Sequence, residues 1–305
     1  MKKILSAALF SCLTISAFSQ QDPFFSQSIF NRLNLNPAYA GMDGTINASI
    51  IGRDQLNTTL PFTAPELMFN GDINIPCINS GIGLTAASSN LGFETRNELK
   101  LSYSYHVKLG NGMLGLGTSV GCYHVALSTG LYFLPNNTVQ QETITANTYD
   151  VCLAIYYATE QGFYFGLSAN DLPQITTSND PVMASNTPIR NYTLMTGNVN
   201  SICSHWDVLE DAYILSNSQY TYAQISLRAQ YNKTAWFGLG YRTDQATILM
   251  AGFNFYCANG SCVKIGYSHD FYYGDITDHN AINELMVQCV IKQKPKEKPA
   301  DAATN

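Results

Sequence analysis

The segment from residue 95 to residue 125 alternates between polar and apolar side chains with a period of two, and only an Asn-Gly turn interrupts it. In its first half the apolar set is Leu99, Leu101, Tyr103, Tyr105, Val107 and Leu109, and the polar set is Glu98, Lys100, Ser102, Ser104, His106 and Lys108. Such alternation is typical of a β-strand whose two faces meet different environments. The Asn111-Gly112 pair predicts a type I′ turn that places Leu109 opposite Leu114 on one face of a hairpin.

The composition favours a hairpin of this kind within a membrane-spanning barrel. Charged residues make up 12% of the chain, whereas they make up about 25% of typical soluble proteins. The chain also contains 19 Tyr, 15 Phe and 22 Gly among its 305 residues. Few charges, many aromatic residues and no long apolar run are typical of an outer-membrane β-barrel, whose wall faces lipid between two aromatic girdles. We therefore expect an all-β, antiparallel transmembrane barrel.

The start of the chain predicts export. Lys2 and Lys3 precede an apolar stretch over residues 4–18, and the small residues Ala17 and Ser19 form a plausible cleavage site, so residues 1–19 are a predicted signal peptide. Beyond them no apolar run approaches the roughly 20 residues that a membrane helix needs. Acidic residues outnumber basic ones, 22 to 16, which argues against nucleic acid as a partner.

We expect about fourteen strands in a barrel over residues 44–291. The predicted strands are 44–53, 66–75, 80–89, 95–109, 113–127, 149–159, 162–170, 190–200, 210–216, 221–231, 235–242, 247–257, 262–271 and 283–291. Short connections, such as residues 232–234, alternate with longer ones, such as 128–148 and 171–189. This alternation is typical of outer-membrane barrels, which have short periplasmic turns and longer external loops. The stretch 201–209 departs from this pattern. It reads as a long connection, although its place in the chain predicts a short periplasmic turn. An even strand count leaves both ends of the chain in the periplasm.

Two segments lie outside this strand pattern. Residues 20–43 are turn-rich and aromatic without alternation, which predicts an amino-terminal periplasmic or plug-like segment, either outside or inside the barrel. Residues 292–305 are charged, contain proline and lack apolar side chains, so we expect a disordered tail.

The cysteines do not form an obvious disulfide framework. Removing Cys12 with the leader leaves an odd number, so they cannot all pair within the chain. Cys257 and Cys262 bracket a hairpin turn, but the parity of the flanking apolar residues puts their sulfur atoms on opposite faces. A bulge would allow the bridge, so both readings stay open.

The sequence carries little that points to catalysis. It contains no His-Glu-x-x-His or Cys-x-x-Cys motif. His269-Asp270 and Asp278-His279 flank one loop and have the chemistry of a metal or acid–base pair, but polar residues are expected there in any case. The Gly115–Gly121 run lies in an alternating strand, where glycines are expected to relieve crowding inside the barrel.

The amino-terminal segment contains two distinctive motifs. They read Gln-Asp-Pro-x-Phe-Ser-Gln from residue 21 and Leu-Asn-Pro-Ala-Tyr-Ala-Gly from residue 35. Their turn pairs suit a linker, whereas aromatic residues in a turn-rich strip are more usual at contact surfaces. Both motifs closely resemble the start of the PorP/SprF family of type IX secretion membrane proteins of Bacteroidetes. Strand blocks at 97–99 with 103–112, 163–168 and 265–271 extend the resemblance over nearly the whole mature chain.

The resemblance implies an integral outer-membrane barrel that works with the type IX export apparatus, through adhesin release or display in some members and the periplasmic ring in others. The implied partners are outer-membrane lipid, ring lipoproteins and gliding-adhesin clients. It offers no catalytic residue, cofactor, metal or small-molecule substrate. The residues that match the signature are candidates for a periplasmic contact: Asp22, Pro23, Phe24, Phe25, Asn36, Pro37, Ala38, Tyr39 and Gly41. The last strand lacks the terminal aromatic residue common in such barrels.

Other functions compete with a non-enzymatic role in secretion. The first alternative is an outer-membrane channel for small or hydrophobic solutes, because the polar strand faces would either line a lumen or pack as an internal network. A secreted adhesive β-protein is disfavoured by the alternating loop lengths, and an enzyme is the least expected class.

Overall fold

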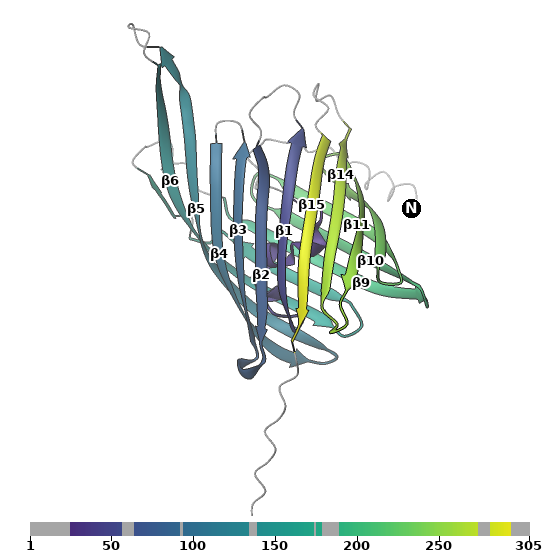
Figure 1. The fold of residues 1–305 in the computed structure, drawn as a ribbon. Helices are drawn as coiled ribbons and strands as arrows, with labels where there is room; N and C mark the ends of the chain where they lie inside the picture. Colours follow the sequence, from purple (N-terminus) through teal and green to yellow (C-terminus); the bar gives the residue numbers. More distant parts are fainter. Residues whose placement is uncertain are drawn as a thin grey trace, which may run out of the picture.

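A computed structural model describes residues 25–56, 64–91, 94–133, 139–173, 175–178, 189–273 and 281–293. Fourteen antiparallel strands close into a barrel (Figure 1), which confirms the predicted fold class. Several predicted features lie outside the described residues. They are the signal peptide, Asp22, Pro23, Phe24, Asp278, His279 and the tail beyond residue 293. No helix in the described part of the chain is long and apolar enough to cross a membrane.

The barrel strands agree with the predicted set, one for one. They are β1 (Thr45–Leu56), β2 (Ala64–Ile75), β3 (Ser80–Leu91), β4 (Glu94–Leu109), β5 (Gly112–Phe133), β6 (Val139–Thr159), β7 (Tyr164–Asn170), β9 (Asn191–Cys203), β10 (Trp206–Ser216), β11 (Thr221–Tyr231), β12 (Ala235–Arg242), β13 (Ala246–Tyr256), β14 (Cys262–Tyr272) and β15 (Ala281–Lys292). A fifteenth strand, β8 (Ile175–Ser178), pairs only with the part of β6 from Ala146 to Tyr149.

The barrel closes between its first and last strands. β1 pairs with β15 in antiparallel register, from Thr45 opposite Lys292 to Leu56 opposite Ala281. The chain therefore enters β1 and leaves β15 at the same end of the barrel. We call this the turn end, because the connections there are short, and we call the opposite end the loop end.

The two faces of each strand meet different surroundings, as predicted. The apolar residues of β4 from Leu99 to Leu109 point outward and are between 39% and 53% exposed. Ser102, Ser104 and His106 point inward and are buried. The outer wall is thus a continuous apolar surface suited to acyl chains, and the inner wall is polar.

The β4–β5 turn corrects one prediction. The loop residues are Gly110 and Asn111, with Leu109 opposite Gly112 and Leu114 opposite Val107. Gly110 has φ +57°, and glycine suits a positive φ at the first turn position. The predicted Asn111-Gly112 turn is therefore wrong by one residue. The partner of Leu114 moves by two residues, from Leu109 to Val107, and because side chains alternate with a period of two, every side chain keeps its expected face.

Two predicted loops are also shorter than expected. Ser204 and His205 alone separate β9 from β10, so the predicted long stretch 201–209 is mostly strand and the turn end keeps its short connections. The predicted 128–148 loop is largely taken up by β5 and β6, which extend as a ribbon beyond the rim at the loop end (Figure 1).

Candidate functional site

Residues 25–43 lie inside the barrel, and we call them the plug. They form three short helical elements, η1 (Ser28–Phe30), α2 (Arg32–Leu35) and η2 (Pro37–Tyr39), drawn in purple behind the wall in Figure 1. Phe25 is 3% exposed and Ala38 is fully buried. Of the two predicted placements for this segment, the structure therefore places the described part inside.

The described members of the predicted contact set are buried together in this plug. They are Phe25, Asn36, Pro37, Ala38, Tyr39 and Gly41. All of them contact other parts of the same chain, so an outside partner reaches them only if the plug leaves the lumen. The predicted periplasmic contact stays a prediction.

Ser26 anchors the first part of the plug toward the loop end. Its backbone N–H donates to Glu284 Oε1 at 2.7 Å, and its hydroxyl donates to Asp270 Oδ2 at 2.6 Å. Arg242 Nη1 donates to the Ser26 hydroxyl at 3.0 Å, and Gln224 Nε2 donates to its carbonyl at 2.8 Å. Every polar group of Ser26 is thus bound to the wall.

Ion pairs lie both beside this anchor and across the lumen from it. Arg242 Nη2 lies 3.0 Å from Asp270 Oδ2, and both side chains are almost fully buried. On the far side of the lumen Lys100 lies 2.6 Å from Glu98 and 3.6 Å from Asp150. The polar inner face here packs as an internal network, one of the two predicted outcomes, and charges paired in this way are tolerated away from water.

Asn36 anchors the second part of the plug. Its side-chain Nδ2 donates to the backbone carbonyls of Ile155 in β6, at 3.0 Å, and Leu167 in β7, at 3.1 Å. Its Oδ1 accepts from the Ala38 N–H at 3.0 Å and caps η2, which begins with Pro37. The Asn-Pro-Ala sequence therefore both starts a helical turn and fastens it to the wall.

Glycines on the inner wall make room for the plug. A Cβ on Gly117 would lie 2.3 Å from Ala38 Cα, and one on Gly81 would lie 2.0 Å from the Ala40 carbonyl oxygen. Similar collisions with plug atoms would occur at Gly83, Gly115, Gly166 and Gly266. This confirms the prediction that glycines relieve crowding inside the barrel, and it identifies the plug as one source of that crowding beside wall side chains such as Lys100 at Gly121.

Aromatic rings and a carboxylate fix the end of the plug that leads into β1. The Arg32 guanidinium lies 4.1 Å from the Tyr164 ring centroid and 5.7 Å from that of Tyr39. Tyr39 donates to Asp43 at 2.6 Å, and burial, with Asp43 beside it, raises the pKa of this tyrosine. Gly41, at φ +71°, donates its N–H to Asp72 at 2.9 Å.

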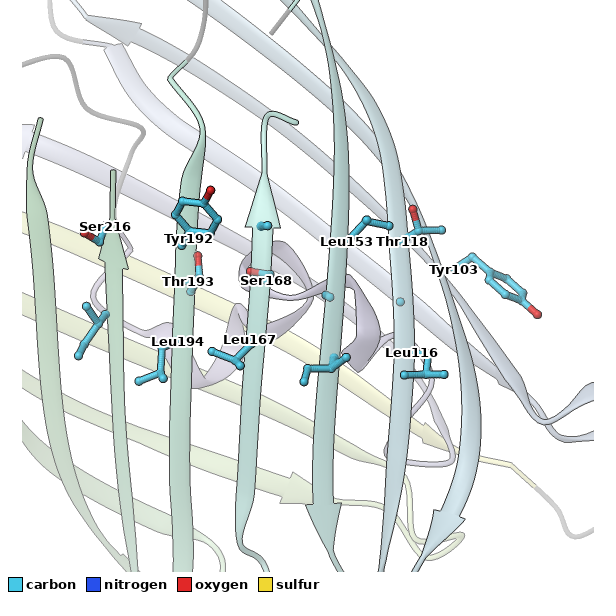
Figure 2. A pocket seen from close by; sticks show the side chains of 15 residues that line it. Tyr103, Leu116, Thr118, Leu153, Leu167, Ser168, Tyr192, Thr193, Leu194 and Ser216 are labelled. Carbon is cyan, nitrogen blue, oxygen red and sulfur yellow. The ribbon is translucent and has the colours of Figure 1, made fainter. Parts of the chain in front are cut away.

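Two hollows flank the plugged lumen. A cavity of about 50 Å³ lies between the plug and the wall, near Phe25, Leu35 and Lys100, and it has room for a few water molecules. A larger hollow of about 770 Å³ lies on the outer wall over β4 to β10 and is lined by apolar side chains such as Leu116, Leu153 and Leu167 (Figure 2). The plug packs behind the same strands.

The other candidate residues that the structure describes form no chemical site. His269 Nδ1 lies 2.8 Å from Asn283 Oδ1, and in the described part of the chain no group of histidine, cysteine and acidic residues is arranged to hold a metal. Cys257 and Cys262 are free, with Cys257 exposed and Cys262 buried. The parity argument against a bridge between them is confirmed.

Comparisons with known proteins agree on the barrel. The family described as "Type IX secretion system membrane protein PorP/SprF" matches residues 17–288. No curated protein matches the chain significantly. Among solved structures, the Ralstonia pickettii toluene transporter TbuX is similar with a TM-score of 0.54 at 10% identity, covering 85% of this chain and 92% of its own.

Two further structures are similar to the same extent. The Pseudomonas putida toluene transporter TodX has a TM-score of 0.51 at 11% identity, with 89% of this chain and 95% of its own covered. The CymD monoaromatic hydrocarbon channel has a TM-score of 0.50 at 12% identity, with 85% and 91% covered. At such low identity these likenesses show a shared barrel fold.

Proposed function

Because the chain belongs to the PorP/SprF family of type IX secretion system membrane proteins, we propose that it serves that machinery as a non-enzymatic outer-membrane component. Its turn end, where β1 begins and β15 ends, faces the periplasm and contacts ring lipoproteins. Its loop end faces outward and assists the export or display of adhesin clients. Short turns on the periplasmic side and longer loops outside are the usual arrangement in bacterial barrels.

The observation that carries this proposal is the seated plug. Ser26 and Asn36 fasten the plug to opposite parts of the wall, and inner-wall glycines fit around it. A lumen filled by such a fitted segment is poorly suited to passing a folded client. The barrel therefore acts as a membrane platform whose two rims recruit other proteins.

Site-specific photocrosslinking in intact cells tests which rim meets which partner. A photoreactive residue replaces Lys233 in the β11–β12 turn, or Ser218 in the β10–β11 turn, since both positions are exposed and lie at opposite ends of the barrel. We expect position 233 to capture ring lipoproteins and position 218 to capture adhesin clients. Capture in the reverse sense, or none from either position, would contradict the proposal.

The second candidate function is a channel for hydrophobic solutes. It is favoured by the fold likeness to two toluene transporters and by the apolar hollow on the outer wall (Figure 2). Toluene uptake by proteoliposomes, compared with liposomes that lack protein, separates the two functions. Uptake above that control supports the channel, whereas no uptake together with capture of secretion components supports the platform.

A further inference from the structure

Three cations in the half of the lumen near the turn end form no close ion pair with a carboxylate, although Asp43 or Asp211 attracts each of them from a greater distance. They are Arg32 of the plug, Arg228 of β11 and Lys264 of β14, and no ion pair links them to any residue that the structure describes. By contrast, Arg53, Lys100 and Arg242 each pair with at least one carboxylate. The unpaired group therefore differs from these three cations.

Two of these cations converge on one aromatic ring of the plug. Arg228 Cζ lies 5.3 Å and Lys264 Nζ lies 5.8 Å from the centroid of Phe30. Arg228 Cζ also lies 5.5 Å from the Trp236 ring, and Arg228 is 4% exposed. Aromatic faces attract cations but do not accept the in-plane hydrogen bonds that a guanidinium donates.

The unused donors of Arg228 form one edge of its guanidinium. Nε and Nη2 are both buried without a hydrogen-bond partner, and so is Nε1 of Trp236. Nε–H and Nη2–H point the same way, which is the fork that binds a carboxylate or phosphate through two parallel hydrogen bonds. Asp211 on the neighbouring strand accepts from Ser28 at 2.9 Å and forms no ion pair with Arg228. A buried fork without an acceptor is unfavourable.

We propose that Arg228 and Lys264, with Trp236 beside them, form an anion site that binds a carboxylate or phosphate group, and that Phe30 covers this site while the plug is seated. The two nitrogens of the fork are fully covered and the Phe30 ring lies against the guanidinium, so an anion enters only when this ring moves aside. Arg32, two residues further along the plug, adds a third positive charge. This inference does not depend on which secretion partner the barrel serves.

Removing the Phe30 ring tests the site directly. Full-length Phe30→Ala protein in detergent is titrated calorimetrically with inorganic phosphate and with benzoate, whose ring fits the vacated space and whose carboxylate suits the fork. We expect the variant to bind both at least about tenfold more tightly than the wild type. Benzamide, which is similar in shape but neutral, should not bind. Stronger binding of benzoate than phosphate would indicate a carboxylate on an apolar group, and the reverse would indicate free phosphate.

Matched variants make the test specific. Phe30→Ala/Arg228→Gln should lose the added affinity, whereas Phe30→Ala/Lys233→Gln, which removes an exposed charge at the same end, should keep it. Equal binding by the Phe30→Ala and Phe30→Ala/Arg228→Gln proteins, or equal binding of benzoate and benzamide, would overturn the proposal.

A second measurement applies if Phe30→Ala does not fold. At matched ionic strength, phosphate at a concentration high enough to displace the Phe30 ring should raise the unfolding temperature of the wild type above its value in chloride, because a ligand that binds the folded state stabilises it. The Arg228→Gln protein should show no such difference. An equal response of the two proteins to phosphate would also overturn the proposal.

Discussion

Gly117 sets one of the closest approaches between the wall and the plug. Because a Cβ there would lie 2.3 Å from Ala38 Cα, Gly117→Val should prevent the plug from seating. We expect the free energy of unfolding in phospholipid bilayers to fall by about 1–3 kcal/mol or more, as overpacking does elsewhere. Urea titration followed by tryptophan fluorescence measures it, since Trp236 lies 5.6 Å from Phe30 of the plug.

Gly52 provides the control for that substitution. It has ordinary space for a Cβ, with its nearest neighbour, a Leu67 methyl group, at 3.4 Å. Gly52→Ala should therefore leave the unfolding midpoint close to that of the wild type. An equal loss in both variants would show that the plug does not set the glycine requirement.

Asn36 both bonds to the wall and caps a helical turn, and substitutions can separate these two roles. Asn36→Ala loses two hydrogen bonds to wall carbonyls and one helix cap, which should lower the free energy of unfolding by about 2–3 kcal/mol. Asn36→Asp keeps the acceptor for the Ala38 N–H but faces the two carbonyls with a carboxylate. We expect it to be at least as destabilised in the same urea titration, and wild-type stability would show that only the cap matters.

Arg242 compensates a buried carboxylate. Arg242→Met leaves Asp270 and the Ser26 hydroxyl without their cationic partner, and breaking such a pair should destabilise the barrel by about 3–5 kcal/mol. The double variant Arg242→Met/Asp270→Leu removes both charges and should recover part of that loss. Equilibrium unfolding in bilayers measures both variants, and no recovery would argue against the pair as the cause.

At the scale of the elements, the plug closes the lumen. Deleting residues 25–41 removes the segment held by Ser26 and Asn36, while all fourteen barrel strands remain. We expect steady conductance in planar bilayers from the deleted variant and none from the wild type. A silent deletion variant that still shows the heat-dependent gel mobility of a folded barrel would contradict the plug's role as the seal.

The strands were predictable because each one carries its own signal. The alternation of polar and apolar residues in β4 depends only on neighbouring residues, and it is confirmed. The same holds for the three-residue turn after Tyr231, across which apolar residues were expected to share a face, and Tyr231 does pair with Ala235. The short turn at Ser204 and His205 was missed because the alternation of polar and apolar residues weakens near Trp206. The two strands nevertheless reach this turn, since β9 ends at Cys203 and β10 begins at Trp206. β8 was missed because four residues give too short a pattern.

The place of the plug could not be predicted from its own residues. Its position depends on contacts more than a hundred residues away, such as those of Ser26 with Glu284 and of Asn36 with Ile155. A short, turn-rich segment gives no periodic pattern that would distinguish a lumen from a solvent-exposed surface. The available signal was indirect, because glycines such as Gly115 and Gly117 lie at inward-facing positions of the wall.

For the whole molecule, the orientation in the membrane is the property to test. Cys77 and Cys257 are exposed at the turn end, and Ser218 is exposed at the loop end. If the turn end faces the periplasm, a membrane-impermeant maleimide should label Ser218→Cys in intact cells and leave the wild type unlabelled. Wild-type labelling should appear once the outer membrane is permeabilised. Labelling of Ser218→Cys only after permeabilisation would reverse the orientation.

The pairing of β1 with β15 has a consequence for assembly. This pairing joins the earliest strand to the latest, so the ring of hydrogen bonds is completed only after translation has produced the whole sheet. Residues 25–43 precede every strand and lead directly into the first partner of that final pairing. A plug that fits its surroundings so closely must therefore find its place before or during this last step, and substitutions that spoil the fit should slow maturation of newly inserted protein.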